Sequence, residues 1–196
     1  ACSVAATCFV LQRYDSSSAF GELRQAESLS KMRTVMATDA DFILLVGGDC
    51  ERYQGWAPGV IELAARFASA GKPVFPVGMY GGAVRRLNRW LLDEKAADGS
   101  AEAWSEIWQR HRRQPLHLPS RRSQAHDAEI VAGLDALHAA IRGAQSGGYF
   151  GIDWADMRLL MTTDSVRVVR RLLERRILPQ MRAHKVRNVG SAPGGV

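Results

Sequence analysis

The sequence predicts an α/β fold, with a Rossmann-like parallel sheet flanked by helices and followed by a C-terminal helical extension. Two apolar runs, at residues 42–46 and 73–77, each end in glycine, and a segment with helical periodicity joins them. This order of strand, loop, helix and strand is a βαβ unit, whose strands run parallel. Ligands of open parallel sheets bind beyond the carboxyl ends of the strands, so we expect a small-molecule site at the two glycine loops.

The first three elements follow from apolar spacing. Residues 3–11 are rich in β-branched and apolar side chains, which predicts a strand. Over residues 20–37 the apolar side chains recur every three to four positions, which indicates an amphipathic helix packed on the sheet. The run at 42–46 is apolar at successive positions, as expected for a central parallel strand that is buried on both faces.

Proline and glycine mark the next elements. Pro58 suits a helix start and Gly71 suits a helix end, so a helix is expected to run to about Ala70. Pro76 lies within the second apolar run, which makes that run an edge strand or ends its ladder of hydrogen bonds at this point. The glycines that follow lead into another predicted helix, over residues 83–92.

The second half of the chain is predicted to be helical. An irregular, basic connector is expected at 112–124, and Pro179 should kink or end the last helix. We therefore divide the chain into a Rossmann-like domain (1–95), a basic helical extension (101–187) and a disordered tail (188–196). Helical patterns cover 101–111, 125–143, 153–161 and 164–184.

Composition narrows the function classes. Hydrophobic residues make up 46% of the 196 residues, which is enough for a packed core, and no apolar run approaches the roughly 20 residues of a membrane span. The apolar N-terminus has no basic n-region, so we interpret it as a strand rather than a signal peptide, and its start without Met suggests a fragment or trimmed chain. Cys2, Cys8 and Cys50 include no Cys-x-x-Cys pair, which fits reduced thiols in a cytoplasmic protein.

Charge separates the two halves of the chain. The formal net charge is +6, yet residues 1–100 carry 11 basic and 11 acidic side chains, while residues 101–196 carry 15 and 9. We therefore expect the halves to do different jobs. The five histidines form no His-x-x-x-His pattern, so neither a metal site nor a cofactor is expected.

The glycine loops suit an anion. Glycine permits positive φ and lets backbone N–H groups approach a phosphate, and a following helix N-terminus adds positive potential. Neither loop matches the Walker or Gly-x-Gly-x-x-Gly pattern, and glycines end strands in α/β proteins generally. Glu62, in the first turn of its helix, is positioned to accept hydrogen bonds from ribose hydroxyls. The predicted ligand-binding residues are Gly47, Gly48, Asp49, Gly59, Glu62, Gly78, Tyr80, Gly81, Gly82 and Arg85.

Three stretches, at 36–48, 59–62 and 71–78, are similar to the SLOG superfamily of nucleotide-binding domains. This group includes LOG-type nucleotide phosphoribohydrolases, DprA-like proteins and the nucleotide-sensing domains of bacterial defence proteins. The LOG enzymes show an Arg before a Met-Ala-x-x-Ala-Asp strand, and then Pro-Gly-Gly-x-Gly-Thr-x-x-Glu. The corresponding positions in this chain are held by Arg33, Gly47, Gly48, Gly59 and Glu62.

Departures from the LOG pattern favour the defence-associated sensor branch. Val46 and Val60 replace the Pro and the Thr of the enzymes, and the turn between Gly48 and Gly59 is much longer. The resemblance implies a bacterial sensor in antiviral defence, which recognises a nucleotide or an ADP-ribose-derived signal and relays it to an effector or to oligomerisation. It also implies a homo-oligomer. The reduced cysteines and the lack of a long apolar run add the expectation of a cytoplasmic protein with no membrane partner.

Two other functions remain open. A nucleotide N-glycosidase would use Glu62 to stabilise an oxocarbenium-like transition state and Arg33 to hold the phosphate. Nucleic-acid binding would use residues 110–122 and 164–187, where arginine dominates and gives phosphate affinity without specificity. Our preferred interpretation of 164–184 is an amphipathic helix that packs on the domain or at an oligomer interface.

Overall fold

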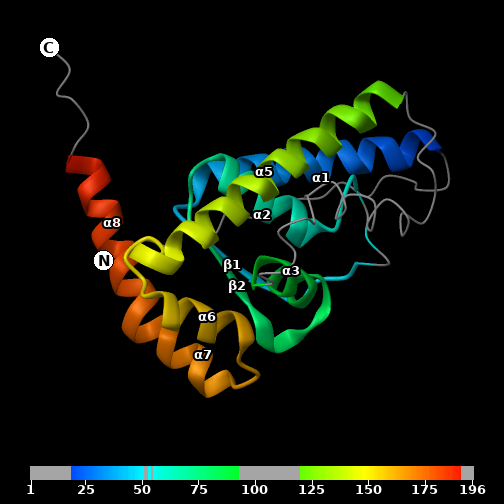
Figure 1. The fold of residues 1–196 in the computed structure, drawn as a ribbon. Helices are drawn as coiled ribbons and strands as arrows, with labels where there is room; N and C mark the ends of the chain where they lie inside the picture. Colours follow the sequence, from blue (N-terminus) through cyan, green and yellow to red (C-terminus); the bar gives the residue numbers. More distant parts are fainter. Residues whose placement is uncertain (1–18, 51–52, 54, 93–119, 191–196) are drawn as a thin grey trace, which may run out of the picture.

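The computed structural model of the chain describes residues 19–50, 53, 55–92 and 120–190 (Figure 1). The helices are α1 (Ala19–Asp39), α2 (Gly59–Ser69), α3 (Gly82–Leu92), α5 (Ser120–Gly147), α6 (Trp154–Thr162), α7 (Val166–Leu172) and α8 (Leu178–Gly190). The strands are β1 (Ile43–Val46) and β2 (Val74–Val77). A 3-10 turn, Gly78–Tyr80, follows β2, and a π-helical turn, Leu173–Ile177, joins α7 to α8.

A parallel sheet of β1 and β2 separates two groups of helices. Ile43 lies opposite Val74 at one end of the pairing, and Val46 lies opposite Val77 at the other. In Figure 1, α1, α2 and α5 lie on one side of the sheet, and α6 and α7 lie on the other. The contacts agree, because α2 packs on both strands and on α5, while α6 packs on β2. This arrangement confirms the predicted α/β class.

One hydrophobic core runs through both sides of the sheet. On α2 the buried positions Ile61, Ala64 and Phe67 follow helical spacing, so one stripe of the helix faces the core. The close packing of α5 on α2 requires Gly133, where a Cβ would lie 2.4 Å from the carbonyl oxygen of Ala65.

Most predicted elements within the described residues are present, with ends that differ by a few positions. The connector expected at 112–124 is an exception, because α5 already begins at Ser120 and runs on to Gly147 rather than ending near 143. That expectation relied on apolar spacing, which gives no signal where a helix is polar, and the arginine, glutamine and alanine in this part favour a helix. The predicted elements at 3–11 and 101–111 lie outside the described residues.

Pro179 does not end the last helix. The π-helical turn lies just before it, and the chain continues as α8 to Gly190, into the first residues of the expected tail. Proline lacks the N–H that would bind the carbonyl of Arg175, and it is tolerated in the first turn of a helix, where that donor is not needed. Because α8 restarts at Leu178, Pro179 occupies such a position. In the described part of the chain, no helix is long and apolar enough to cross a membrane.

Tyr149 should make the free energy of unfolding decrease as the pH rises through the alkaline range. Its hydroxyl oxygen accepts a hydrogen bond from the backbone N–H of Val74, 3.1 Å away. Burial raises the pKa of Tyr149 from 10.0 to about 12, and this hydrogen bond only partly opposes the shift. Between these two values the unfolded tyrosine loses its proton while the folded one keeps it, so the free energy of unfolding should fall by about 1.4 kcal/mol per pH unit.

Urea unfolding between about pH 9 and 11 checks this expectation. The Tyr149→Phe variant should be less stable at pH 9, since Val74 loses its acceptor, but its stability should decline less steeply with pH. Tyr80→Phe is the matched control, because Tyr80 is exposed and its loss should leave the slope unchanged. Equal slopes for wild type and Tyr149→Phe would contradict the assignment.

Candidate functional site

The two predicted glycine loops meet at the carboxyl edge of the sheet. The backbone N–H groups of Ala83 and Val84, in the first turn of α3, donate hydrogen bonds of 2.9 Å to the carbonyls of Gly48 and Gly47. The first N–H groups of a helix have no partner inside the helix, which is why helix N-termini often bind anions. Here two of these donors already bind the neighbouring loop.

Glycine at position 82 is required by this loop-to-loop contact. A Cβ on Gly82 would lie 2.1 Å from the carbonyl oxygen of Gly48, and the residue has a φ of +63°. Gly78 has a different role, because a Cβ there would lie 2.1 Å from the carbonyl oxygen of Met161 at the end of α6. Asn88 of α3 donates a hydrogen bond of 2.8 Å to the same carbonyl. Because Gly78 has no side chain, α6 can pack closely against the end of β2 at this buried position.

Several predicted ligand residues are exposed at this edge. Tyr80 is 59% exposed and lies beside Gly47, and Val46 at the end of β1 is 44% exposed. Gly48, Asp49 and Gly82 are also exposed. Arg85 projects from α3 and forms an ion pair with Asp164, 3.6 Å away in the turn between α6 and α7. Because both partners are solvent-exposed, this pair contributes little to stability.

Glu62 lies in the interior, between two arginines. Its side chain is 0% exposed, and its Oε2 atom pairs with the guanidinium of Arg33 from α1. Its Oε1 atom accepts a hydrogen bond of 3.0 Å from Nε of Arg66, and the ion pair with this arginine has Nη2 at 2.9 Å. A buried carboxylate is tolerated only when it is paired in this way.

The Arg33 guanidinium lies against the loop that leads into α2. A Cβ on Gly59 would be 2.7 Å from Nη2 of Arg33, and a Cβ on Gly55 would be 3.2 Å from Nη1. Glycine at position 59 thus makes room for the buried arginine. The structure therefore brings together Arg33, Gly59 and Glu62, but in the core rather than at the exposed edge.

Sequence reasoning missed Arg66 and Ser30. Arg66 follows Glu62 by four residues on α2, and this spacing was a signal for a pair on one helix face. Its guanidinium also donates a hydrogen bond to the hydroxyl of Ser30 on α1, which no local pattern indicates.

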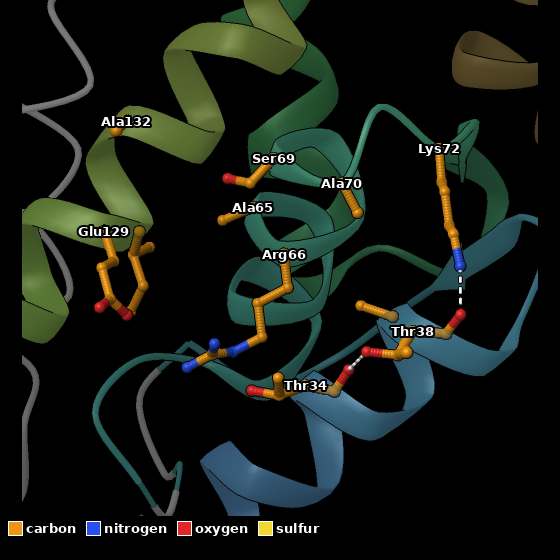
Figure 2. A pocket seen from close by; sticks show the side chains of 11 residues that line it. Thr34, Thr38, Ala65, Arg66, Ser69, Ala70, Lys72, Glu129 and Ala132 are labelled. Carbon is orange, nitrogen blue, oxygen red and sulfur yellow. Dashed lines mark hydrogen bonds between the residues drawn. The ribbon is translucent and has the colours of Figure 1, made fainter.

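A cleft of about 640 Å³ lies over α2, between α1 and α5 (Figure 2). Arg66 and Lys72 contribute its cationic groups, and Lys72 donates a hydrogen bond to the carbonyl of Thr38. None of the predicted ligand residues lines this cleft. Within the described ranges, no group of three or more His, Cys, Asp or Glu side chains is placed to hold a metal ion.

A model of the SLOG cluster2 family matches residues 12–125. The chain belongs to this family. The match contains α1, β1, α2, β2 and α3, and with them every predicted ligand residue of the SLOG domain, whereas α6, α7 and α8 lie outside it. Membership of the family indicates a nucleotide-related function. No curated protein and no solved structure shows significant similarity to the chain.

Proposed function

We propose that the SLOG domain binds a nucleotide at the exposed carboxyl edge of β1 and β2 and acts as a sensor. The observation that carries the choice of sensing over catalysis is the state of Glu62, which is fully buried with both carboxylate oxygens paired. The exposed Tyr80, beside the loop after β1, supports the location of the ligand.

Catalysis of N-glycoside cleavage is the alternative, and it requires a different arrangement of Glu62. A carboxylate that stabilises an oxocarbenium-like transition state must touch the sugar. In this structure Glu62 has no exposed surface, and Arg33 and Arg66 occupy its oxygens. Release of free base from nucleoside monophosphates by the purified chain would support the enzyme and overturn the sensor.

In the proposed complex, the base stacks on Tyr80 and the phosphates approach Arg85. Asp49 supplies a carboxylate that can accept hydrogen bonds from ribose hydroxyls. A nucleotide or ADP-ribose derivative carries all three chemical groups. We extend the proposal to the defence-associated role implied by the resemblance: a cytoplasmic bacterial sensor that passes its signal to an effector or to a homo-oligomer.

The ion pair between Arg85 and Asp164 gives this signal a path. A phosphate bound by Arg85 would compete with Asp164 and so release this residue of the turn between α6 and α7. The exchange is inexpensive, because an exposed pair of this length contributes no more than about 1 kcal/mol. Binding at the edge would thus reach helices that lie outside the family match.

A thermal-shift screen against nucleotides and ADP-ribose derivatives tests the site. A ligand at 100 times its Kd should stabilise the folded chain by about 2.7 kcal/mol. The Tyr80→Ala variant should bind that ligand about 5-fold to 150-fold more weakly, because base stacking on an aromatic ring contributes about 1 to 3 kcal/mol. Its own melting temperature should not change, since Tyr80 is exposed.

Leu159→Ala is the matched control for this experiment. Leu159 is an exposed apolar residue of α6, and its removal should leave ligand affinity unchanged. If Tyr80→Ala binds as tightly as the wild type, the ligand does not lie at this edge.

A further inference from the structure

Three arginines form a row along the last helical run of the chain. Arg167, Arg171 and Arg175 follow one another at four-residue intervals, and all three are exposed. We call these three residues the arginine row. At about 1.5 Å per residue, successive members lie roughly 6 Å apart along the helix axis. The buried side chains of the same run are Val169, Leu172, Ile177 and Met181.

The π-helical turn Leu173–Ile177 helps to keep the row straight. In an α-helix a four-residue step advances about 40° beyond a full turn, so a row of this spacing drifts around the helix. A π-helical turn holds more residues and rotates less per residue, which moves Arg175 back into line with Arg167. The same turn keeps Ile177 in the core, where it is 1% exposed. Single π-helical turns are frequent at functional sites.

The row is not balanced by carboxylates. In the part of the chain that the structure describes, none of its guanidinium groups forms an ion pair, whereas Arg170 pairs with Glu174 at 2.7 Å and Arg176 pairs with Asp156 at 3.3 Å. Like charges four residues apart destabilise a helix by about 0.2 to 0.5 kcal/mol per pair. The row therefore carries a small cost that a bound polyanion would remove.

The charge of the whole molecule is concentrated in these helices. Residues 153–190 carry nine basic and four acidic side chains, an excess of five, against a net charge of +6 for the entire chain. In Figure 1, α7 lies at the periphery, on the side of the sheet away from α1 and α2, and α8 extends along the margin of the molecule. A long anionic partner can thus approach the row from solvent.

We propose that the arginine row binds the phosphodiester backbone of a nucleic acid strand without reading its bases. Arginine suits this task, because its planar fork donates two parallel hydrogen bonds to one phosphate. Sequence-specific readers add asparagine or glutamine that reach base edges. The three residues between each pair of successive row members supply none, since all six are valine, leucine, arginine or glutamate. This binding is independent of the nucleotide site proposed for the SLOG domain.

Fluorescence anisotropy of the full chain with a labelled single strand and with its duplex tests the proposal. If the row neutralises three phosphates, a plot of log affinity against log salt concentration should have a negative slope. Its magnitude should be at least about 2 for the single strand and about 2.7 for the duplex. The triple variant Arg167→Gln, Arg171→Gln, Arg175→Gln should bind at least about tenfold more weakly at 50 mM salt, and its slope should be lower by about 2 to 3. All three residues are exposed, so its melting temperature should not fall.

Two controls separate the row from charge in general. Arg170→Gln with Glu174→Gln changes the same helix without changing the net charge and should bind as the wild type does. A variant with Lys31→Gln, Arg89→Gln and Arg142→Gln removes three exposed positive charges on other helices and should lose far less affinity than the row variant. Equal losses in these two triple variants would overturn the proposal.

The nature of the polyanion is tested in the same format. Polyglutamate and vesicles rich in phosphatidylserine should bind more weakly than the nucleic acid at equal charge concentration. Tighter binding of either competitor, or a row variant that keeps the affinity and slope of the wild type, would overturn the assignment.

Discussion

Replacing Glu62 by glutamine is expected to lower the free energy of unfolding by about 3 to 5 kcal/mol. The change removes one negative charge from between two arginines, and it leaves the guanidinium of Arg33, which is only 6% exposed, without its counter-charge. An unpaired charge in the core is costly because the low-dielectric interior replaces water. Urea unfolding followed by circular dichroism measures the difference.

Glu129→Gln is the control for the Glu62 variant. Glu129 is exposed on α5, and its substitution should change stability by no more than about 0.5 kcal/mol. A double variant, Arg33→Gln with Glu62→Gln, should be more stable than the sum of the single changes indicates, by about 0.5 to 3 kcal/mol. A loss below about 1 kcal/mol for Glu62→Gln would show that the pairing does not hold in solution.

This prediction also bears on how the function is tested. Glu62→Gln is the obvious variant for a catalytic carboxylate, but a loss of activity in it would follow from unfolding as readily as from chemistry. Tyr80→Ala avoids this problem, since Tyr80 contributes little buried surface. The two variants together distinguish a failed ligand site from a failed fold.

Gly78→Ala is expected to destabilise the fold by about 3 kcal/mol, the upper end of the usual cost of overpacking. The added methyl group would lie 2.1 Å from the carbonyl oxygen of Met161, and the neighbour is backbone rather than a flexible side chain. Either β2 or the end of α6 must move, which also disturbs the hydrogen bond from Asn88. Thermal unfolding measures the effect.

Gly143→Ala gives the opposite expectation and serves as the control. A Cβ at Gly143 meets no atom within 4 Å, and the residue is exposed in the helix α5. Alanine should therefore stabilise the chain by about 0.5 to 1 kcal/mol. A Gly78→Ala variant as stable as the wild type would mean that this glycine is not required for packing.

The order of helices and strands up to Leu92 is well predicted because its signals are local. Apolar spacing indicates α1 and α2, Gly71 marks the end of α2, and the two apolar runs mark the strands. Local signals are weaker in the second half, where the first turn of α5 is polar and where the helix that Pro179 was expected to kink or end continues as α8 after a π-helical turn.

The environment of the candidate site depends on contacts that are remote in sequence. Arg33 and Glu62 are 29 residues apart, and family resemblance singled out both without showing that they bind each other in the core. The glycine loops were predicted as one phosphate cradle. In the structure Gly82 admits the carbonyl of Gly48 and Gly78 admits the carbonyl of Met161, while phosphate binding by these loops stays a prediction. Spacing reveals that a glycine is needed but not which group approaches it.

The hydrogen bonds from α3 to the loop after β1 have a mechanical consequence. Ala83 and Val84 hold the carbonyls of Gly48 and Gly47, so this loop cannot swing open as a hinge without leaving two backbone donors unsatisfied. A ligand that binds there contacts a loop that is already ordered, so binding loses little conformational entropy of the loop. New ligand preferences would then arise from side chains in the long turn between Gly48 and Gly59, while the glycines themselves stay unchanged.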